Sequence, residues 1–344
     1  MSGERLLITG SAGFLGSHAV RGALAKGREV IGLDALTYAG DPTRLAHLDH
    51  SYRLVHVDVA DREAVRRVLS EANPVAVMHF AAETHVTRSE TDSGTFLRTN
   101  VEGTRVMLEE SVWAGVRRFV HISTDEVYGP IADRAFQEED KVPGTGQATS
   151  PYAKSKSAAD DIATSFREVR DMQTVVIRPT NCFGPGQFPE KALARWITRA
   201  LTGKPLPIWG DGRYVRQWLH ACDLVDAVEL VLDTPDPEPV YNVGPRHRPE
   251  ITNYELAGWL LDYLGLPDDL LQFTQYDRPG HDRRYAVDPR RIEALGWRSG
   301  NIQDQLAATI EWYRHNAGWW RRHVAEAESI YVDDVPARAS EVPT

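Results

Sequence analysis

The sequence predicts an α/β fold in which a doubly wound parallel sheet is joined to a smaller, mixed α/β lobe. Short β-like runs alternate with amphipathic helical stretches through the first half of the chain. A glycine-rich segment separates the first β-like run from the first helical stretch, and the alternation loosens after about residue 180. Strands and helices in this alternation are typical of a parallel sheet that is covered by helices.

The strand-like runs of the first half carry apolar residues consecutively, as strands do when they are buried on both faces. In the second half, Pro and Gly interrupt the helical patterns, which suits a smaller lobe with long loops. We expect strands at 5–9, 29–33, 53–57, 75–79, 117–122 and 173–178, helices near 14–26, 62–72, 96–114 and 151–169, and further helices near 191–202, 222–232, 252–264 and 302–316.

Length, charge and cysteine content limit the classes of function. The chain has 344 residues, of which 42% are hydrophobic, as is ordinary for a globular protein with a core. Its formal net charge of −10 argues against binding to nucleic acid or an anionic membrane, since both need a positive face. No apolar run approaches membrane-spanning length, and a strand-like run takes the place of a secretory leader. The two cysteines and twelve histidines show no disulfide framework and no metal-ligand spacing, so we expect a cytoplasmic protein without a metal.

Three glycines between the first strand and the first helix predict a dinucleotide site of the Rossmann type. Gly10 permits a tight turn, Gly13 lets the backbone approach a pyrophosphate, and Gly16 lets helix and strand pack closely. The amino terminus of the helix then faces the phosphates. Asp34 ends the second strand, where a carboxylate binds the ribose hydroxyls and repels a 2′-phosphate, so NAD is favoured over NADP. Surface-turn glycines are the alternative, which the position after a buried strand disfavours.

Asp58 and Val59 follow the third predicted strand, and two interpretations of them remain open. Either they contact the adenine of the dinucleotide, or they cap the amino terminus of the next helix. Both interpretations suit an aspartate at the end of a strand.

Tyr152 and Lys156 stand four residues apart, so that both project from one face of a predicted helix. A tyrosine is a poor base near neutral pH because its reference pKa is about 10. An adjacent ammonium and a cationic nicotinamide would both favour the phenolate. A chance pair on an exposed helix is the alternative, and the preceding glycine-rich loop favours a catalytic pair.

Thr124, Asp125 and Glu126 directly follow the fifth predicted strand, and strand carboxyl ends are where open α/β sheets bind ligands. An acid beside a base suits an elimination, in which one group removes a carbon-bound proton while the other protonates the departing hydroxyl. Burial and neighbours must separate the two pKa values for this chemistry. A solvated acidic turn is the alternative.

At these residues the chain resembles the extended short-chain dehydrogenase/reductases, and among them the dTDP-glucose 4,6-dehydratases. The Asp125-Glu126 pair distinguishes these dehydratases from related epimerases and decarboxylases, which lack it. Further matches run nearly end to end, with Leu-Thr-Tyr-Ala-Gly at 36–40, His-Phe-Ala-Ala-Glu-Thr-His-Val-Thr-Arg-Ser at 79–89, Phe-Pro-Glu-Lys at 188–191, Arg-Gln-Trp-Leu at 216–219 and Asp-Arg-Pro-Gly-His-Asp-Arg-Arg-Tyr at 277–285.

The resemblance implies a three-stage cycle on a nucleoside-diphosphate hexose, with NAD as a bound cofactor. Tyr152 takes the proton of the sugar 4-hydroxyl, which Thr124 holds, while a hydride leaves C4 for NAD⁺. Glu126 then removes the C5 proton and Asp125 protonates the C6 hydroxyl, which releases water. The hydride returns to C6 and Glu126 returns a proton to C5, which yields a 4-keto-6-deoxy sugar.

We expect the chain to divide into two lobes and a tail, and the resemblance assigns binding residues to the lobes. We expect an NAD-binding Rossmann domain at 1–178 and about 213–240, a sugar-nucleotide lobe at about 179–212 and 241–326, and a mobile tail at 327–344. The residues assigned to NAD are Gly10, Gly13, Phe14, Leu15, Gly16, Asp34, Ala35, Leu36, Thr37, Asp58, Val59, Phe80, Ala81, Ala82, Thr84, Thr99, Tyr152, Lys156 and Cys182. Those assigned to the substrate are Thr84, Thr124, Asn181, Lys191, Ala192, Pro207, Ile208, Arg216, Asn242, Asp277, Arg278 and His281.

Among the substrate residues, Arg216 and Arg278 are the expected pyrophosphate partners, since guanidinium groups match phosphate oxygens. Two positions depart from the family pattern: Thr87 stands where the family usually has Asp, and Cys182 where it usually has Asn. A thiol is a weak hydrogen-bond donor, so the pocket for the carboxamide of NAD would differ. The departures leave the nucleotide base and the hexose open.

The apolar residues along 96–114, such as Phe96, Met107 and Leu108, and the helix at 151–169 have two interpretations. Either they pack against the matching helices of a partner, as the homodimer implied by the resemblance would require, or they pack within one chain. The aromatic residues at 312–320 indicate helix packing rather than a ligand site.

Two alternative functions remain open. A related sugar-nucleotide enzyme would share the oxidation at C4, whether an epimerase, a 5-epimerising or 5,6-ene-forming dehydratase, or a dehydratase of another nucleoside-diphosphate hexose. A non-catalytic NAD-sensing or scaffold protein is the other, since fold alone does not determine function. Such a protein can dispense with the Tyr/Lys pair, which this chain keeps.

Overall fold

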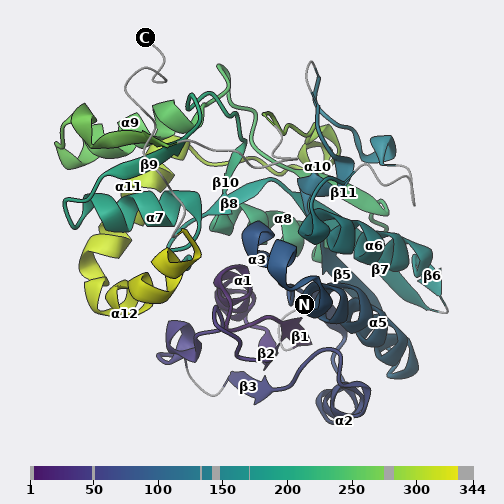
Figure 1. Cartoon of the computed structure of the whole chain (residues 1–344). Helices are drawn as coiled ribbons and strands as arrows, with labels where there is room; N and C mark the ends of the chain where they lie inside the picture. The colour runs from purple at the N-terminus through teal and green to yellow at the C-terminus, as the bar shows by residue number, and fades with distance from the viewer. Residues whose placement is uncertain are drawn as a thin grey trace.

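The largest part of the fold is one eight-stranded β-sheet with helices packed against it (Figure 1). The computed structural model describes residues 4–48, 51–131, 134–141, 148–169, 171–274 and 283–331. The strands are β1 (Arg5–Thr9), β2 (Glu29–Asp34), β3 (Tyr52–His56), β4 (Ala76–His79), β5 (Arg118–Ile122), β6 (Glu168–Val169), β7 (Met172–Pro179), β8 (Asn181–Phe183), β9 (Leu206–Trp209), β10 (Trp218–His220), β11 (Val240–Val243) and β12 (Leu271–Thr274). The α-helices are α1 (Phe14–Ala25), α2 (Arg62–Ala72), α3 (Val86–Thr91), α4 (Ser93–Phe96), α5 (Thr104–Trp113), α6 (Pro151–Ser165), α7 (Ala192–Ala200), α8 (Ala221–Asp233), α9 (Asn253–Leu264), α10 (Arg290–Ala294), α11 (Ile302–His315) and α12 (Ala317–Glu328).

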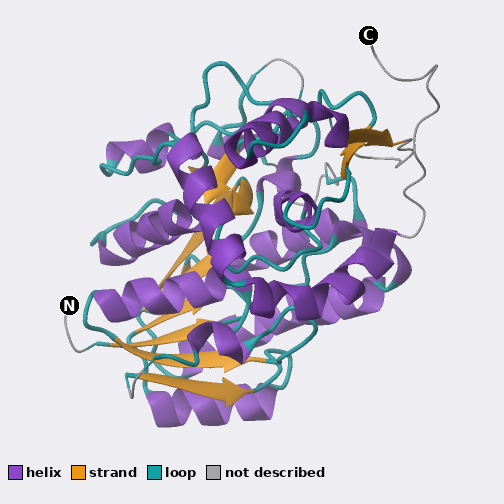
Figure 2. Cartoon of the chain, turned by 90° about the vertical axis from the view of Figure 1, so that its left-hand side faces the viewer, coloured by secondary structure: helices purple, strands orange, loops and turns teal. Residues whose placement is uncertain are grey.

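The strands of the large sheet run in the order β11-β7-β5-β4-β1-β2-β3, and each neighbouring pair in this order is parallel. Strand β6 adds to β7 in antiparallel orientation. Figure 2 shows these strands between helices on both sides. The predicted doubly wound parallel sheet is therefore confirmed, and all six predicted strands are present.

The consecutive apolar residues of the strands divide between two cores because successive side chains point to opposite faces. In β1, Leu6 and Ile8 face a core formed with α1 and α8, whereas Leu7 faces a core formed with α2, α5 and α6. Phe96, Met107 and Leu108 are also buried within the chain. The alternative in which these three residues pack within one chain is the correct one.

A second group of elements packs around its own core beside the sheet. Helices α7, α9, α11 and α12 bury apolar residues together with β9 and β12, which pair in parallel. The aromatic residues of α11 and α12 join this core, where the Trp320 indole donates to the Tyr313 carbonyl oxygen at 2.7 Å. The expected role of these aromatics in helix packing is confirmed. No helix among the described residues has the length and apolar character that a membrane crossing requires.

Three expectations about individual elements are corrected. The helix expected at 151–169 ends at Ser165, because Glu168–Val169 forms a short antiparallel pair with the start of β7. The helix expected at 96–114 includes a π-helical stretch at Leu97–Gly103. The tail expected from 327 begins within α12, which runs to Glu328, and the Tyr331 hydroxyl beyond it donates to the Glu190 carbonyl oxygen at 2.5 Å.

Candidate active site

One cavity of about 480 Å³ lies along the carboxyl ends of the parallel strands. Its lining comes from the loops after β1, β2, β3, β4, β5 and β7, from α6, and from residues within 95–99 and 187–191. The carboxyl ends of the strands are the usual place for a ligand in an open α/β sheet. Of the residues predicted to bind NAD, all except Leu36 line this cavity.

The glycine loop after β1 lines the cavity with Gly10, Gly13 and Gly16. Gly10 has φ +65°, and a Cβ there would lie 2.8 Å from the Ala81 backbone nitrogen. A Cβ on Gly16 would lie 2.0 Å from the Gly10 carbonyl oxygen. No side chain caps the amino terminus of α1 at Gly13, so the helix presents backbone N–H groups to the cavity. This arrangement fits the pyrophosphate of a dinucleotide.

We predict that Gly16→Ala lowers the free energy of unfolding by about 1–3 kcal/mol, as overpacking does, and weakens NAD binding by displacing Gly10. Thermal unfolding and a binding titration with NAD measure the two effects. Gly258→Ala is the matched control, because a Cβ at this position in α9 meets no atom within 4 Å. The control should keep wild-type NAD affinity and gain up to about 1 kcal/mol from its better helix propensity. Equal behaviour of the two variants would contradict the prediction.

Asp34 lies at the end of β2 with both carboxylate oxygens directed by backbone amides. Oδ2 accepts from Ala12 N at 2.9 Å and Oδ1 accepts from Leu36 N at 2.8 Å. Burial raises the pKa of this carboxyl. Leu36 itself has φ +51° and does not line the cavity, so its contribution is to orient Asp34 through its N–H.

Asp58 and Val59 both line the cavity, and neither caps α2. Asp61 is the N-cap, and its side chain accepts from Ala64 N. Asp58 forms an ion pair with Arg98 at 2.7 Å. The N-cap interpretation of Asp58 and Val59 is therefore wrong, whereas their adenine contact stays a prediction.

The predicted catalytic residues come together from two elements. Thr124, Asp125 and Glu126 begin the turn after β5, and Tyr152 and Lys156 lie on α6. All five line the cavity. Helix α6 starts where it does because the Ser150 side chain caps it by accepting from Ala153 N, with Pro151 at its first position.

Contacts join the two elements at the bottom of the cavity. The Thr124 side chain hydrogen-bonds with the Tyr152 phenol. The Lys156 ammonium donates to the Ile122 carbonyl oxygen at 2.7 Å, so it contacts the strand that leads into the acidic turn. The five residues therefore share one buried polar centre.

The two acidic residues at this centre differ in burial: Asp125 is buried, whereas Glu126 is partly exposed. Burial and, after it, the neighbouring charge of Glu126 raise the pKa of Asp125 to about 7, although the Arg216 charge opposes the rise. At neutral pH Asp125 is therefore poised to donate a proton. An elimination requires a proton donor of this kind beside its base.

The pKa of the Tyr152 phenol differs from the sequence-based expectation. Burial raises it, with a further rise from the Glu126 charge, and the hydrogen bond with Thr124 opposes the rise. The Lys156 ammonium, which was expected to favour the phenolate, donates to the Ile122 carbonyl oxygen instead. Burial also lowers the pKa of Lys156 to about 8, while the Asp160 charge raises it.

Several buried polar atoms face the cavity without a hydrogen-bond partner among the described residues. Beside Glu190 Oε2, they include three atoms near the predicted acidic turn and the end of β7: Asp125 Oδ2, Thr180 Oγ1 and Asn181 Oδ1. Buried polar atoms normally have a partner, so these three fit a polar ligand. They lie on both the β5 and β7 sides of the cavity, as a sugar ring between them would require.

The predicted substrate residues do not all meet in this cavity. Thr84, Thr124, Asn181 and Lys191 line it, and the Lys191 ammonium donates to the Thr84 carbonyl oxygen at 2.9 Å. Asp277, Arg278 and His281 lie outside the described residues. Ala192, Pro207, Ile208, Arg216 and Asn242 are not part of the lining.

The residues outside the lining have other surroundings. Ile208 belongs to the core of the second group of elements. Asn242 accepts from the Tyr128 hydroxyl at 2.7 Å and donates to the Phe136 carbonyl oxygen at 3.0 Å, so both ends of its amide are already engaged. Arg216 is buried over the Tyr285 ring, although its charge reaches Asp125.

The cavity also includes residues that the sequence patterns missed. Glu190 precedes Lys191 in the Phe-Pro-Glu-Lys segment, and Thr180 precedes Asn181 at the end of β7. Position next to a predicted site residue is the signal that could have found them. The further lining residues not predicted are Ala39, Gly40, Val57, Glu83, Thr95, Arg98, Ile122, Ser123, Pro179, Gln187 and Phe188.

Of the two positions that depart from the family pattern, Cys182 lines the cavity. Its thiol donates to the Thr180 carbonyl oxygen at 3.3 Å, and burial raises its pKa, so it is a neutral thiol. Thr87 lies on α3, outside the lining.

Comparisons with known proteins agree with this site. Residues 6–244 match the NAD dependent epimerase/dehydratase family. The chain is 41% identical over 312 residues to the low-salt glycan biosynthesis protein Agl12 of Haloferax volcanii. This match covers 90% of this chain and 98% of that protein. It is 42% identical over 324 residues to a dTDP-glucose 4,6-dehydratase of Streptomyces antibioticus, with 92% and 94% covered.

A solved structure has the same fold. The crystal structure of DesIV, a dTDP-glucose 4,6-dehydratase from Streptomyces venezuelae with NAD and TYD bound, matches with a TM-score of 0.86. The two sequences are 41% identical, and the match covers 92% of this chain and 99% of that one. The family match spans the glycine loop, the acidic turn and the Tyr/Lys pair. The chain therefore belongs to the NAD dependent epimerase/dehydratase family.

Proposed function

We propose that the protein dehydrates a nucleoside-diphosphate hexose, dTDP-glucose, to its 4-keto-6-deoxy form with NAD as a resident cofactor. The observation that carries this proposal is the convergence of Thr124, Asp125, Glu126, Tyr152 and Lys156 on one cavity beside the glycine loop. Relatives that are named dTDP-glucose 4,6-dehydratases support the same reaction.

The residues divide the proton transfers among them. Tyr152 accepts the proton of the 4-hydroxyl, and Thr124 holds that hydroxyl. Glu126 removes the C5 proton, Asp125 protonates the C6 hydroxyl as water leaves, and Glu126 then returns its proton to C5. The glycine loop with Gly10, Gly13 and Gly16 would hold NAD, which would supply hydride transfer from C4 and back to C6 and a cationic nicotinamide that favours the Tyr152 phenolate.

The two lobes would divide the ligands. We propose that the sheet domain, at 1–178 and about 213–240, holds NAD, and that the segments at about 179–212 and 241–326 hold the sugar nucleotide. The glycine loop on one side of the cavity and Asn181 and Lys191 on the other support this division.

Turnover of dTDP-glucose tests the proposal. The product is followed by the absorbance that a 4-keto-6-deoxy sugar develops in alkali. An epimerase would convert the sugar without loss of water, and a non-catalytic NAD-binding protein would convert none. Absence of turnover with dTDP-, UDP-, CDP- and GDP-hexoses alike would refute the dehydratase function.

The state of the cysteines supports a cytoplasmic location. Cys182 and Cys222 are free thiols. Free thiols are normal in a reducing compartment, where disulfides are rare.

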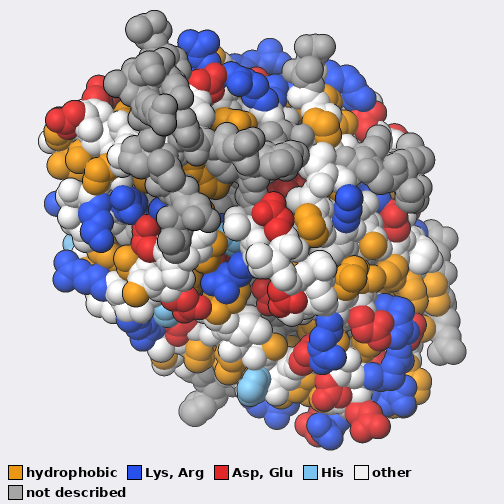
Figure 3. All heavy atoms as spheres, viewed as in Figure 1, with side chains coloured by type: hydrophobic (Ala, Val, Ile, Leu, Met, Phe, Trp, Pro, Cys, Tyr) orange, Lys and Arg blue, Asp and Glu red, His pale blue; other side chains and the backbone are white. Residues whose placement is uncertain are grey.

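We also propose a homodimer formed through the helical stretch that ends in α5. Leu97 and Trp113 on this stretch are each 55% exposed. Figure 3 shows acidic and basic side chains intermingled over α2 and α5, and Arg105 pairs with both Glu102 and Glu109 there. A surface that carries both signs of charge can face its own copy across a two-fold axis.

We predict that Leu97→Asp converts the dimer to a monomer, because it places a charge in the apolar part of the interface. Light scattering coupled to gel filtration measures the mass. Tyr263→Asp is the control, because Tyr263 is 46% exposed on α9, outside the proposed interface. A wild-type chain that is monomeric at micromolar concentration, or a Leu97→Asp variant that stays dimeric, would rule out this interface.

A further inference from the structure

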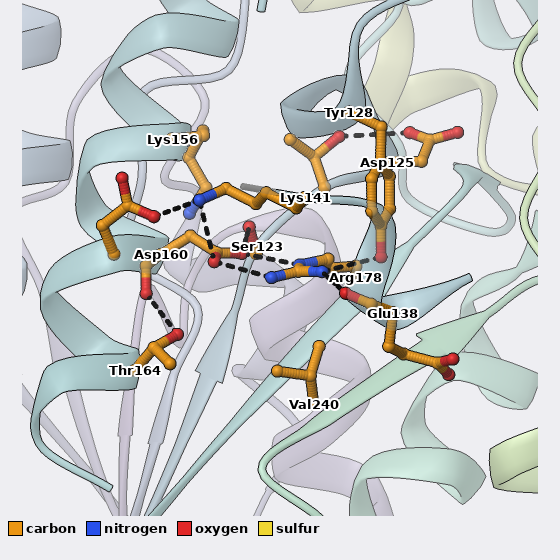
Figure 4. Close-up of polar contacts among 12 residues, drawn as sticks. Ser123, Asp125, Tyr128, Glu138, Lys141, Lys156, Asp160, Thr164, Arg178 and Val240 are labelled. Carbon is orange, nitrogen blue, oxygen red and sulfur yellow. Dashed lines mark hydrogen bonds and ion pairs between the residues drawn. The ribbon is translucent and has the colours of Figure 1, made fainter. Parts of the chain in front are cut away.

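A buried ion pair lies directly behind the catalytic residues (Figure 4). Arg178 on β7 donates from Nε and Nη2 to the two carboxylate oxygens of Asp160 on α6, each at 2.9 Å. Both side chains are almost completely buried, with residue exposures of 3% and 0%. Two parallel hydrogen bonds of this kind set the orientation of the two groups as well as their distance.

The pair holds both ends of the turn that carries the catalytic acid and base. At one end, the Ser123 hydroxyl donates to Asp160 Oδ2 at 2.9 Å. At the other end, the Tyr128 hydroxyl accepts from Arg178 Nη1 at 2.7 Å. Figure 4 shows Ser123 and Tyr128 reaching Asp160 and Arg178 from either side. The residues between these two anchors are Thr124, Asp125 and Glu126, with Val127.

The pair also connects to the helix that carries the Tyr/Lys pair. Asp160 lies four residues after Lys156 and eight after Tyr152 on α6, on the same face of the helix. Its negative charge raises the pKa of Lys156, which burial lowers to about 8.

The other groups that face Lys156 do not supply a negative charge. His79 on β4 and His121 on β5 are buried beside it, and burial lowers the pKa of both imidazoles, so they are neutral. In the absence of NAD, burial raises the pKa of Tyr152, so its phenol supplies no negative charge either. Among the described residues, Asp160 is the one carboxylate that acts on the charge of Lys156.

We propose that Asp160 is a positioning residue of the active site: together with Arg178 it fixes the turn that bears Thr124, Asp125 and Glu126 against the helix that bears Tyr152 and Lys156. Stability alone does not account for such a pair, since well-packed apolar residues can replace a buried ion pair without loss. Catalysis does, because both halves of the catalytic set act on one sugar ring and a small displacement between them lowers the rate. The inference rests on the proposed dehydration.

The central test is Asp160→Asn in the full chain with NAD. We expect kcat for dTDP-glucose to fall about a hundredfold, as a misplacement of catalytic groups does, while KM changes little. Loss of the Asp160 charge lowers the pKa of Lys156, so the alkaline limb of the pH profile of NADH formation, a step in which Asp125 takes no part, should move to lower pH. Thr164→Val is the matched control, because Thr164 donates at 2.8 Å to the Asp160 main-chain carbonyl oxygen and leaves the carboxylate untouched. The control should keep the wild-type kcat and pH profile.

A second variant covers the case in which Asp160→Asn does not fold. Ser123→Ala removes the anchor at one end of the turn and keeps the ion pair. We expect it to fold and to lose about tenfold in kcat at nearly constant KM, as the loss of one buried hydrogen bond allows. A folded Asp160→Asn with wild-type kcat and alkaline limb, or a Ser123→Ala with wild-type kcat, would overturn the proposal.

A measurement without substrate separates this proposal from the proposed function. The pKa of Lys156 is followed by the pH dependence of its reductive methylation, located by mass spectrometry, in wild type and in Asp160→Asn. A lower pKa in the variant supports the role of Asp160 even if no hexose is turned over. An unchanged pKa in an enzyme that dehydrates dTDP-glucose refutes the action of Asp160 on Lys156 and leaves the function standing.

Discussion

Tyr152→Phe is expected to lower kcat for dTDP-glucose by about 10³-fold or more, within the range for loss of a general base. Phe keeps the ring that packs edge-on against Phe96 at 6.3 Å and removes only the hydroxyl. Without the hydroxyl, the group that takes the proton of the 4-hydroxyl in the proposed mechanism is missing. The first oxidation should therefore fail, and the 340 nm absorbance of NADH should not appear after substrate is mixed with the enzyme.

The control is Tyr241→Phe, which removes the hydroxyl of another buried tyrosine. The Tyr241 hydroxyl accepts from Glu238 N at 2.8 Å, and the residue is not part of the cavity lining. This variant should turn over at the wild-type rate. If NADH forms at a normal rate in Tyr152→Phe, Tyr152 is not the base.

Asp125→Asn is expected to slow the loss of water by about 10²–10³-fold, because an amide cannot donate the proton that a carboxylic acid donates. Oxidation at C4 depends on Tyr152 and Thr124, so it should proceed. Enzyme-bound NADH should then accumulate, and rapid mixing with detection at 340 nm measures both its formation and its slow decay. A variant that loses C4 oxidation and dehydration equally would contradict the assignment of Asp125 as the acid.

The raised pKa of Asp125 gives this prediction a pH dependence. The acid is present below about pH 7 and is lost as the pH rises through that value, so wild-type dehydration should fall on the alkaline side. In the folded state Asp125 binds its proton more tightly than in the unfolded state, so the group lowers the free energy of unfolding as the pH rises toward 7. Asn carries no such charge. At pH 8 the variant should therefore unfold at a higher temperature than wild type, while it dehydrates more slowly.

The features that could be predicted from the sequence are the ones that local patterns specify. Consecutive apolar residues identified all six strands of the first half, because a strand buried on both faces needs them. The spacing of Gly10, Gly13 and Gly16 identified the loop under the cavity, because backbone contacts exclude a Cβ at these places. Likewise, an interval of four residues placed Tyr152 and Lys156 on one helical face.

Contacts between distant segments were beyond those patterns. Asn242, predicted to bind the sugar nucleotide, has its amide engaged by Tyr128, 114 residues away, and is not part of the cavity lining. The pKa of Tyr152 was likewise beyond them: burial raises the pKa of this phenol, whereas its spacing from Lys156 suggested a lowered one. Burial depends on the whole surrounding structure, which no interval within a helix encodes.

The sequence by itself therefore determined the chemical groups of the site, whereas the tertiary structure decided their arrangement. Residue types and short spacings were enough to name the fold, the nucleotide loop and the acid, base and phenol. Three other features depend on packing between segments that lie far apart in the chain. These are the set of predicted site residues that meet in one cavity, the departure of each pKa from its usual value, and the contact through which Asp160 joins the acidic turn to the Tyr/Lys helix. Desolvation and ion pairing act through space, so the folded arrangement alone sets their size.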